Sequence, residues 1–232
     1  MKKIIVIAAA LTLLFIDLLS AHELWVAKEK GNLVVMFKHD GKSDPYKPEF
    51  VKIAKGFDSS GREVAVRVIP QGTRTLLAPA QPPALVSIVY SPGVYCKTPE
   101  GYKNISKRDA KDAIESIRAE IFNKNFWQWN DRFAKPLGGK MELVPLKNPL
   151  VLKVEDKLPF QVLYDGQPLP GAAVIAEGIE KDSLKTDGNG RAEVIIKRDG
   201  LNVVKARRKT PTVNDPDADI LIEIANISFS VK

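Results

Sequence analysis

Short apolar segments that alternate with polar residues recur along most of this chain, and they constrain its fold more than any other feature. Residues 63–69, for example, place valine at every second position, at Val64, Val66 and Val68. Such alternation over four to eight residues is typical of a β-strand with one buried face. The segments follow one another at spacings of about ten residues, separated by turns such as Asp58-Ser59-Ser60-Gly61 and Asp165-Gly166. This pattern predicts a mainly β protein built from two immunoglobulin-like β-sandwich parts, not a parallel sheet.

The pattern changes along the chain and predicts four parts. Residues 1–21 form a leader, and residues 22–95 form an N-terminal β-sandwich. Residues 96–139 form a short helical, aromatic-rich connector. Residues 140–232 form a second, immunoglobulin-like sandwich of about the usual 100 residues. Within its last strand, alternation at Ile222 and Ile224 resumes one residue out of phase at Ile227, which predicts a bulge.

The connector is predicted to contain an amphipathic helix. Ser106 is suited to cap its first turn, with Asp109 three residues later. Apolar residues then follow at helical spacing, namely Ala110, Ile114, Ile117 and Ile121. An aromatic cluster comes next, comprising Phe122, Phe126, Trp127, Trp129 and Phe133. These rings either pack between the two sandwiches or stack on a ligand such as a sugar, and the packing interpretation is favoured because aromatic residues mostly bury area.

The leader has the features of a secretory signal. Two lysines precede an apolar run from Ile4 to Ile16, which is shorter than the roughly 20 residues that span a bilayer. Cleavage after Ala21 would make His22 the first residue of the mature chain. Cleavage after Ser20 would leave Ala21 first, and retention as an uncleaved anchor is a third alternative. We expect export and cleavage, and therefore a periplasmic protein.

Charge and cysteine content narrow the partners. The net charge of +7 is basic, but the lysines are spread out, and the densest basic run, 205–209, adjoins a loop rich in proline and aspartate. A nucleic-acid partner is not expected, because such proteins carry a dense basic stripe with stacking aromatics. The single cysteine, Cys96, allows no intrachain disulfide, and we expect it to be buried.

The chain has two histidines, His22 and His39. They stand at the start of one predicted strand and the end of the next, so a hairpin would bring them to the same end. A histidine at a free N-terminus offers its α-amine and its Nδ1 to one metal ion. Together with His39 this makes an all-nitrogen ligand set, suited to Ni, Co, Cu or Zn ions. Glu23, Asp40 and Asp44 are candidate oxygen ligands by proximity alone.

Several motifs resemble the DUF4198 family. They are "AHELWV" at the leader junction, "TPEGYKNISK", "LVPLKNP", "YDGQPLPGAAVIAE" and "TDGNGRAEV". The family in turn resembles periplasmic components of nickel and cobalt uptake transporters. The resemblance implies a periplasmic, two-part β-sandwich protein that handles a divalent transition metal beside an ABC-type membrane transporter. It places the terminal histidine ligand on His22 and the strand-end histidine on His39. The membrane part would be another chain.

Two alternatives remain. A terminal histidine with a second histidine is also the ligand set of copper-dependent oxidative enzymes, the histidine-brace site. A carbohydrate or cell-surface binding module is the other, drawn from the sandwich fold and Trp127 and Trp129. The chain carries no nucleophile elbow, no HExxH and no phosphate-binding glycine loop. We therefore expect a metal-binding protein and not an enzyme.

Overall fold

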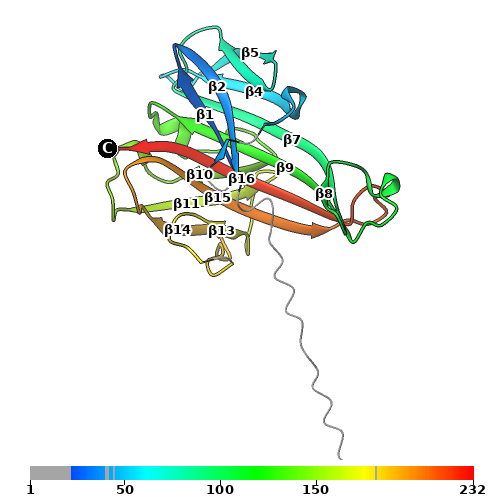
Figure 1. The fold of residues 1–232 in the computed structure, drawn as a ribbon. Coiled ribbons are helices and arrows are strands. Elements are labelled where there is room, and N and C mark those ends of the chain that lie inside the picture. The colour runs from blue at the N-terminus through cyan, green and yellow to red at the C-terminus, as the bar shows by residue number, and fades with distance from the viewer. Residues whose placement is uncertain (1–21, 40–41, 44, 181) are drawn as a thin grey trace, which may run out of the picture.

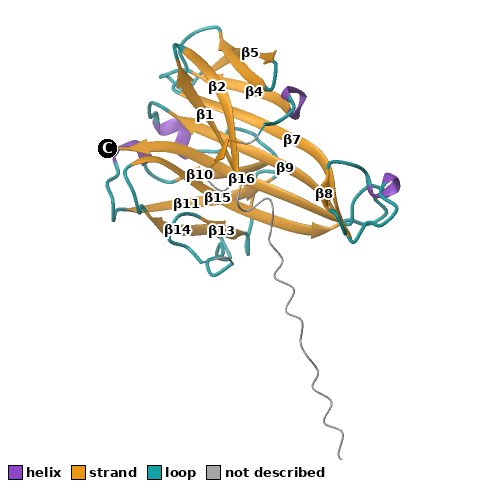
Figure 2. Cartoon of the chain, viewed as in Figure 1, coloured by secondary structure: helices purple, strands orange, loops and turns teal. Residues whose placement is uncertain are grey.

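A computed structural model of the chain describes residues 22–39, 42–43, 45–180 and 182–232, apart from the side chains of residues 22, 39, 42 and 43. The predicted leader, Asp40 and Asp44 lie outside the described residues. The chain is mainly β, as the alternating pattern predicts (Figure 2). In the part described, the helical elements are short 3-10 turns, namely η1 (Pro48–Phe50), η2 (Lys107–Asp109), η3 (Asp131–Ala134) and η4 (Pro149–Val151).

Most strands belong to one twelve-stranded sheet, here called the large sheet, in which β1-β2-β6-β5-β4-β7-β9-β16-β15-β13 lie in that order. Its strands are β1 (His22–Glu29), β2 (Asn32–His39), β3 (Lys42–Ser43), β4 (Val51–Phe57), β5 (Glu63–Gln71), β6 (Arg74–Pro79), β7 (Leu85–Thr98), β8 (Gly101–Lys103), β9 (Glu115–Phe126), β13 (Ala173–Ile175), β15 (Gly200–Pro211) and β16 (Ile220–Val231). A small sheet contains β10 (Met141–Pro145), β11 (Lys157–Tyr164), β12 (Gln167–Pro168) and β14 (Arg191–Ile195).

The large sheet curls back on itself at β5. The first residues of β5, Glu63–Ala65, pair with β4, whereas Val66–Gln71 pair with β6. The strands beyond this point, β6, β2 and β1, therefore fold over the middle of the sheet, and β1 returns to β9 and β16 (Figure 1). A buried apolar cluster fills the enclosed space, with Leu24, Val35, Ile88, Ile121 and Ile224 among its members.

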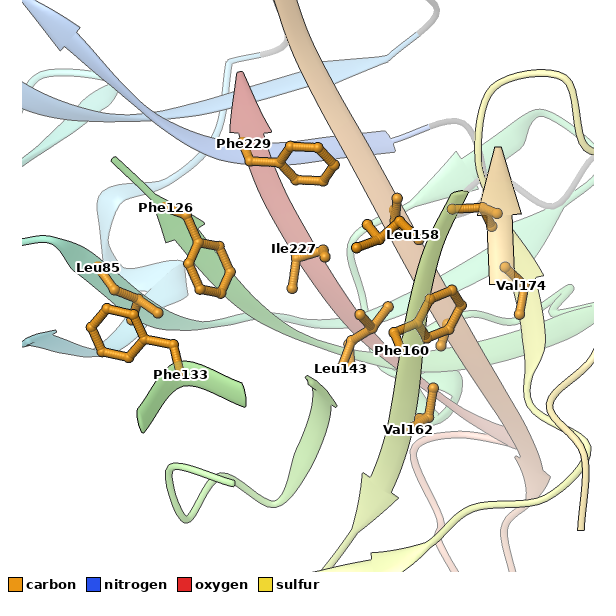
Figure 3. Close-up of a cluster of buried hydrophobic side chains, with 14 of the residues drawn as sticks. Leu85, Phe126, Phe133, Leu143, Leu158, Phe160, Val162, Val174, Ile227 and Phe229 are labelled. Atoms are coloured by element: carbon orange, nitrogen blue, oxygen red, sulfur yellow. The ribbon is translucent and has the colours of Figure 1, made fainter. Parts of the chain in front are cut away.

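The small sheet covers the opposite face of β16. Ile222 and Ile224 belong to the cluster beneath β1 and β2, whereas Ile227 and Phe229 belong to a second cluster with Leu143 and Phe160 of the small sheet. Figure 3 shows the side chains of this second cluster gathered between β16 and the small sheet. We call the side of the central strands that is covered by β1 and β2 the hairpin face, and the side that is covered by the small sheet the small-sheet face.

The predicted bulge in the last strand is wrong. β16 pairs with β15 in one continuous register from Ile220 to Val231. The apolar residues change phase because the strand is buried on both faces, first mainly on the hairpin face and then mainly on the small-sheet face. A phase change therefore marks a change of covering layer, not an inserted residue.

The predicted helix at 106–121 is also wrong. Ser106 does cap a turn, since its side chain accepts a hydrogen bond from the Arg108 amide, but the turn is the short η2. Residues 115–126 form strand β9. Ile117 and Ile121 stand four residues apart, a spacing that places two residues on one side of a helix and of a strand alike. Pairing with β7 and β16 on either side decides for the strand.

The aromatic cluster follows the packing interpretation. Phe126, Trp129 and Phe133 pack on one another with ring centroids 6.0–6.2 Å apart, and Phe57 adds a further edge contact. Trp127 packs against the cluster beneath the hairpin, with the Lys28 ammonium over its ring. The two halves of the chain share the large sheet, because β9 and β16 pair in parallel. The boundaries at 95/96 and 139/140 stay predictions.

Candidate metal-binding end of the first hairpin

The hairpin of β1 and β2 is closed by a two-residue turn. Lys30 and Gly31 both have positive φ angles, 48° and 84°, as the type I′ hairpin turn requires. Glycine adopts this conformation without strain, which explains Gly31. A two-residue turn fixes the register, so Glu29 stands opposite Asn32 and His22 stands opposite His39. The two histidine positions are therefore cross-strand partners at the open end of the hairpin, the end that the sequence predicts they share.

Side-chain amides, not a neighbouring strand, bind the outer edge of β1. The Asn125 Oδ1 accepts a hydrogen bond from the Val26 amide at 3.1 Å. The Leu24 carbonyl accepts hydrogen bonds from the Nδ2 atoms of Asn123, at 3.1 Å, and Asn226, at 2.8 Å. These asparagines lie on the hairpin face of β9 and β16 and are almost fully buried. They hold an edge strand that would otherwise leave buried backbone groups unpaired.

These contacts determine how the histidine positions pair. An amide has one hydrogen, so Val26, whose N–H points to Asn125, does not donate to β2. Val26 and Leu24 are therefore non-hydrogen-bonded positions of the β1/β2 ladder, and His22, two residues before Leu24, has the same parity. Cα atoms of such pairs lie about 4.5 Å apart, against about 5.5 Å in hydrogen-bonded pairs. Among the two kinds of cross-strand pair, His22 and His39 occupy the closer one.

Charged residues of β15 lie near Glu23, the second residue of β1. Glu23 lines a hollow together with Lys205 and Arg198. Lys205 is almost completely buried, and the pKa of its ammonium is lowered to about 8, mainly by burial; Glu23 opposes this shift and the nearby Arg207 adds to it. A carboxylate beside His22 is thus engaged with a buried cation, which makes Glu23 a weak candidate for a metal ligand.

Other candidate ligands do not gather near this end. Among the described side chains, which exclude both histidines, no group of three or more His, Cys, Asp or Glu is placed to hold a metal ion. Cys96 lies in β7, fully buried, and its Sγ donates a hydrogen bond to the Ile105 carbonyl at 3.3 Å. Burial raises the pKa of this thiol. Cys96 is buried as the sequence predicts.

The asparagines that hold β1 were not predicted from the sequence. Asn123 and Asn125 stand two residues apart in a strand, and Asn226 lies in another. Asparagine is depleted in strands, so three asparagines within apolar strand segments indicate side chains that form buried hydrogen bonds. Their hydrogen-bond partners could not be predicted from the sequence, because these partners are about 100 or more residues away in the chain.

A family model described as "Domain of unknown function (DUF4198)" matches residues 19–210, which include every strand from β1 to β14 and most of β15. The description names no metal, reaction or partner. No curated protein and no solved structure matches the chain. No helix in the described part of the chain is both long enough and apolar enough to cross a membrane.

Proposed function

This chain belongs to the DUF4198 family, and from that premise we propose that it binds a divalent transition metal ion at the open end of its first hairpin. His22 and His39 are the proposed ligands. The observation that carries the proposal is their register, since the only two histidines of the chain are direct cross-strand partners. The hairpin itself does not require histidine at either position, so a shared function explains the pairing better than chance.

The ladder geometry supports a chelate at residue 22. At a non-hydrogen-bonded position the backbone nitrogen points away from the partner strand. An α-amine at His22 would therefore bind a metal without breaking a β1/β2 hydrogen bond. The amine, its own imidazole and the imidazole of His39 make an all-nitrogen set that suits Ni(II), Co(II) or Cu(II). This set exists only if the leader is removed after Ala21.

The proposed set predicts a pH dependence. The ligand nitrogens must be free of protons, and reference pKa values are about 6.5 for histidine and about 7.7–8.0 for an α-amine. Metal affinity should therefore fall as the pH drops below neutral. The proposed setting is the periplasm, with delivery to or from an ABC-type nickel or cobalt transporter. The leader and the family resemblance support this setting. The proposed role is binding, not catalysis.

The finer domain organisation is also a proposal. Seven strands, β10–β16, divide between two facing sheets within residues 140–232, which supports an immunoglobulin-like unit there. Limited proteolysis tests the division. First cleavages within residues 96–139 would support two units, whereas first cleavages inside either unit would count against them.

Metal titration of the exported, purified protein tests the function. Calorimetry with Ni, Co, Cu and Zn ions should give one site per chain, and mass measurement should give a mature chain beginning at His22. His22→Ala and His39→Ala should each weaken binding by at least about 100-fold, since even outer-shell partners of metal sites are worth 10–100-fold. Lys38→Ala, next to His39 with both histidines kept, is the matched control and should bind as the unchanged protein.

Two outcomes would overturn the proposal. One is metal binding that survives both histidine substitutions. The other is a mature chain that begins at Ala21 and binds as tightly as one beginning at His22. If copper bound at this site supports oxidation of a polysaccharide by peroxide, the copper-dependent enzyme replaces the binding role.

A further inference from the structure

A groove lies on the small-sheet face of β4, β7 and β9, beside the region that the small sheet covers. Its cavity measures about 330 Å³, at the lower end of the usual range for small-molecule sites. The cross-strand register builds its floor in two rows. Ile53, Val89 and Phe122 are partners in one row, and Lys55, Ser87 and Lys124 are partners in the next. One row is apolar and the other is polar.

The apolar row is open to solvent. Ile53 is 50% exposed, whereas the row on the other side of the polar one, formed by Phe57, Leu85 and Phe126, is buried in the core. Leu137, just before β10, and Met141, the first residue of β10, form an apolar wall of the groove. An exposed apolar row inside a hollow is a surface that an apolar molecule would cover.

A buried ion pair closes the inner end. The Lys124 side chain is 7% exposed and the Glu142 side chain 3%, and the ammonium donates a hydrogen bond to the Glu142 carboxylate. The segment before β10 wraps around this carboxylate, which accepts hydrogen bonds from the amides of Leu137, Gly138 and Gly139. A Cβ at Gly139 would lie 3.1 Å from the Glu142 Cγ, so the close wrap favours glycine there.

Two of the three hydrogen-bond donors of the Lys124 ammonium have no acceptor among the described residues. An ammonium has three N–H groups, and Glu142 takes one of them; no other described residue accepts from Lys124. Burial lowers the pKa of this ammonium, and the neighbouring Glu142 opposes that effect. In the middle of the polar row, the half-buried Ser87 makes no side-chain hydrogen bond with the described residues. The remaining Lys124 donors are buried, and because buried donors without acceptors are unfavourable, a ligand with an acceptor would satisfy them.

Within the described chain, Lys124 is the cation of the groove that has hydrogen-bond donors left for an anion. Lys55 and Lys140 also line the groove, but Lys55 pairs with Glu63, and Lys140 pairs with Glu120 and Glu223. We propose that this groove binds a small amphipathic carboxylate, with the apolar chain along Ile53, Val89 and Phe122 and the carboxylate on Lys124 and Ser87. The site is separate from the hairpin end, and it does not depend on metal binding. The volume of the groove favours a medium-length chain.

Calorimetry with decanoate on the full mature chain tests the site. Decanoate should bind one per chain, at least about tenfold more tightly than decyltrimethylammonium, which carries the same chain with the opposite charge. Ile53→Asp should weaken decanoate binding by at least about tenfold, because it places a charge in the apolar row. Ile69→Asp, a 37% exposed strand residue outside the groove, is the matched control and should bind as the unchanged protein.

The role of Lys124 is tested by the double variant Lys124→Met with Glu142→Gln, which removes both charges together. It should bind decanoate no better than decan-1-ol. Ile53→Asp changes an exposed side chain, so it keeps the test valid if the double variant does not fold. Equal binding of decanoate and decyltrimethylammonium would overturn the proposal, as would equal effects of the two aspartate substitutions.

Discussion

The two faces of β16 are covered in different ways. On the small-sheet face, Ile227 and Phe229 pack against Leu143 and Phe160 in a continuous apolar cluster. On the hairpin face, the end of β16 beyond Ile224 presents Asn226 and Ser228, both almost fully buried. Asn226 bonds the backbone of β1 directly, and Ser228 donates to Asn125, which accepts from β1 in turn.

The small sheet is held mainly by apolar packing, whereas β1 is also positioned by specific hydrogen bonds. Apolar packing is non-directional, and a layer held by it can shift slightly without losing contact. Hydrogen bonds to one carbonyl and one amide define where β1 lies along the sheet. The strand that carries His22 is thus held by directional bonds, at the cost of buried amide oxygens on Asn123 and Asn226 that have no partner among the described residues.

The largest expected effect comes from the apolar side. Phe160→Ala should lower the free energy of unfolding by about 3–5 kcal/mol, because Phe160 is fully buried and its loss leaves a cavity. Chemical denaturation measures this change. Val151→Ala, at a 69% exposed position, is the control and should have little effect. A loss below about 1 kcal/mol for Phe160→Ala would mean that this cluster repacks freely.

On the hairpin face, Asn125→Ala should lower the free energy of unfolding more than Asn226→Ala does. Without Asn125, the Val26 amide and the Ser228 hydroxyl lose their acceptor, and each unsatisfied buried donor costs about 1–3 kcal/mol. Without Asn226, the Leu24 carbonyl keeps its bond from Asn123. Hydrogen exchange of the Val26 amide is the sharper measurement, and it should accelerate in Asn125→Ala only. Equal acceleration in both variants would show that the asparagines act by packing.

The smallest effect concerns the turn before β5, the strand at which the large sheet curls. The Asp58 carboxylate accepts hydrogen bonds from the Ser60 hydroxyl and from the amides of Arg62 and Ser60, which lower its pKa to about 2. A lowered folded pKa contributes stability above the ordinary value, and that contribution is lost as the pH falls toward 2. Asp58→Asn should therefore flatten the stability profile between about pH 4 and pH 2. An unchanged profile would contradict this role.

Particular residues show how far sequence reasoning reached. The alternation in 63–69 predicted a strand, and the segment from Glu23 to His39 predicted a hairpin, and the structure contains both. The hairpin turn lies at Lys30-Gly31, one residue before the Gly31-Asn32 turn that the sequence predicts. Ile117 and Ile121 led to a helix because four-residue spacing suits both periods. Lys124 and Glu142 gave no signal, because each is an ordinary charged residue until the other is folded against it.

By itself the sequence determined the β class and the presence of the first hairpin, because both depend on residues close together in the chain. It also predicted that the two histidines share one end of this hairpin, whereas the structure decided the register that makes them cross-strand partners. Only the tertiary structure decided that β1 returns to β9 and β16, that β16 is buried on both faces, and that Lys124 meets Glu142 beside an apolar row. These features depend on contacts between strands far apart in the chain, which local pattern and propensity do not encode.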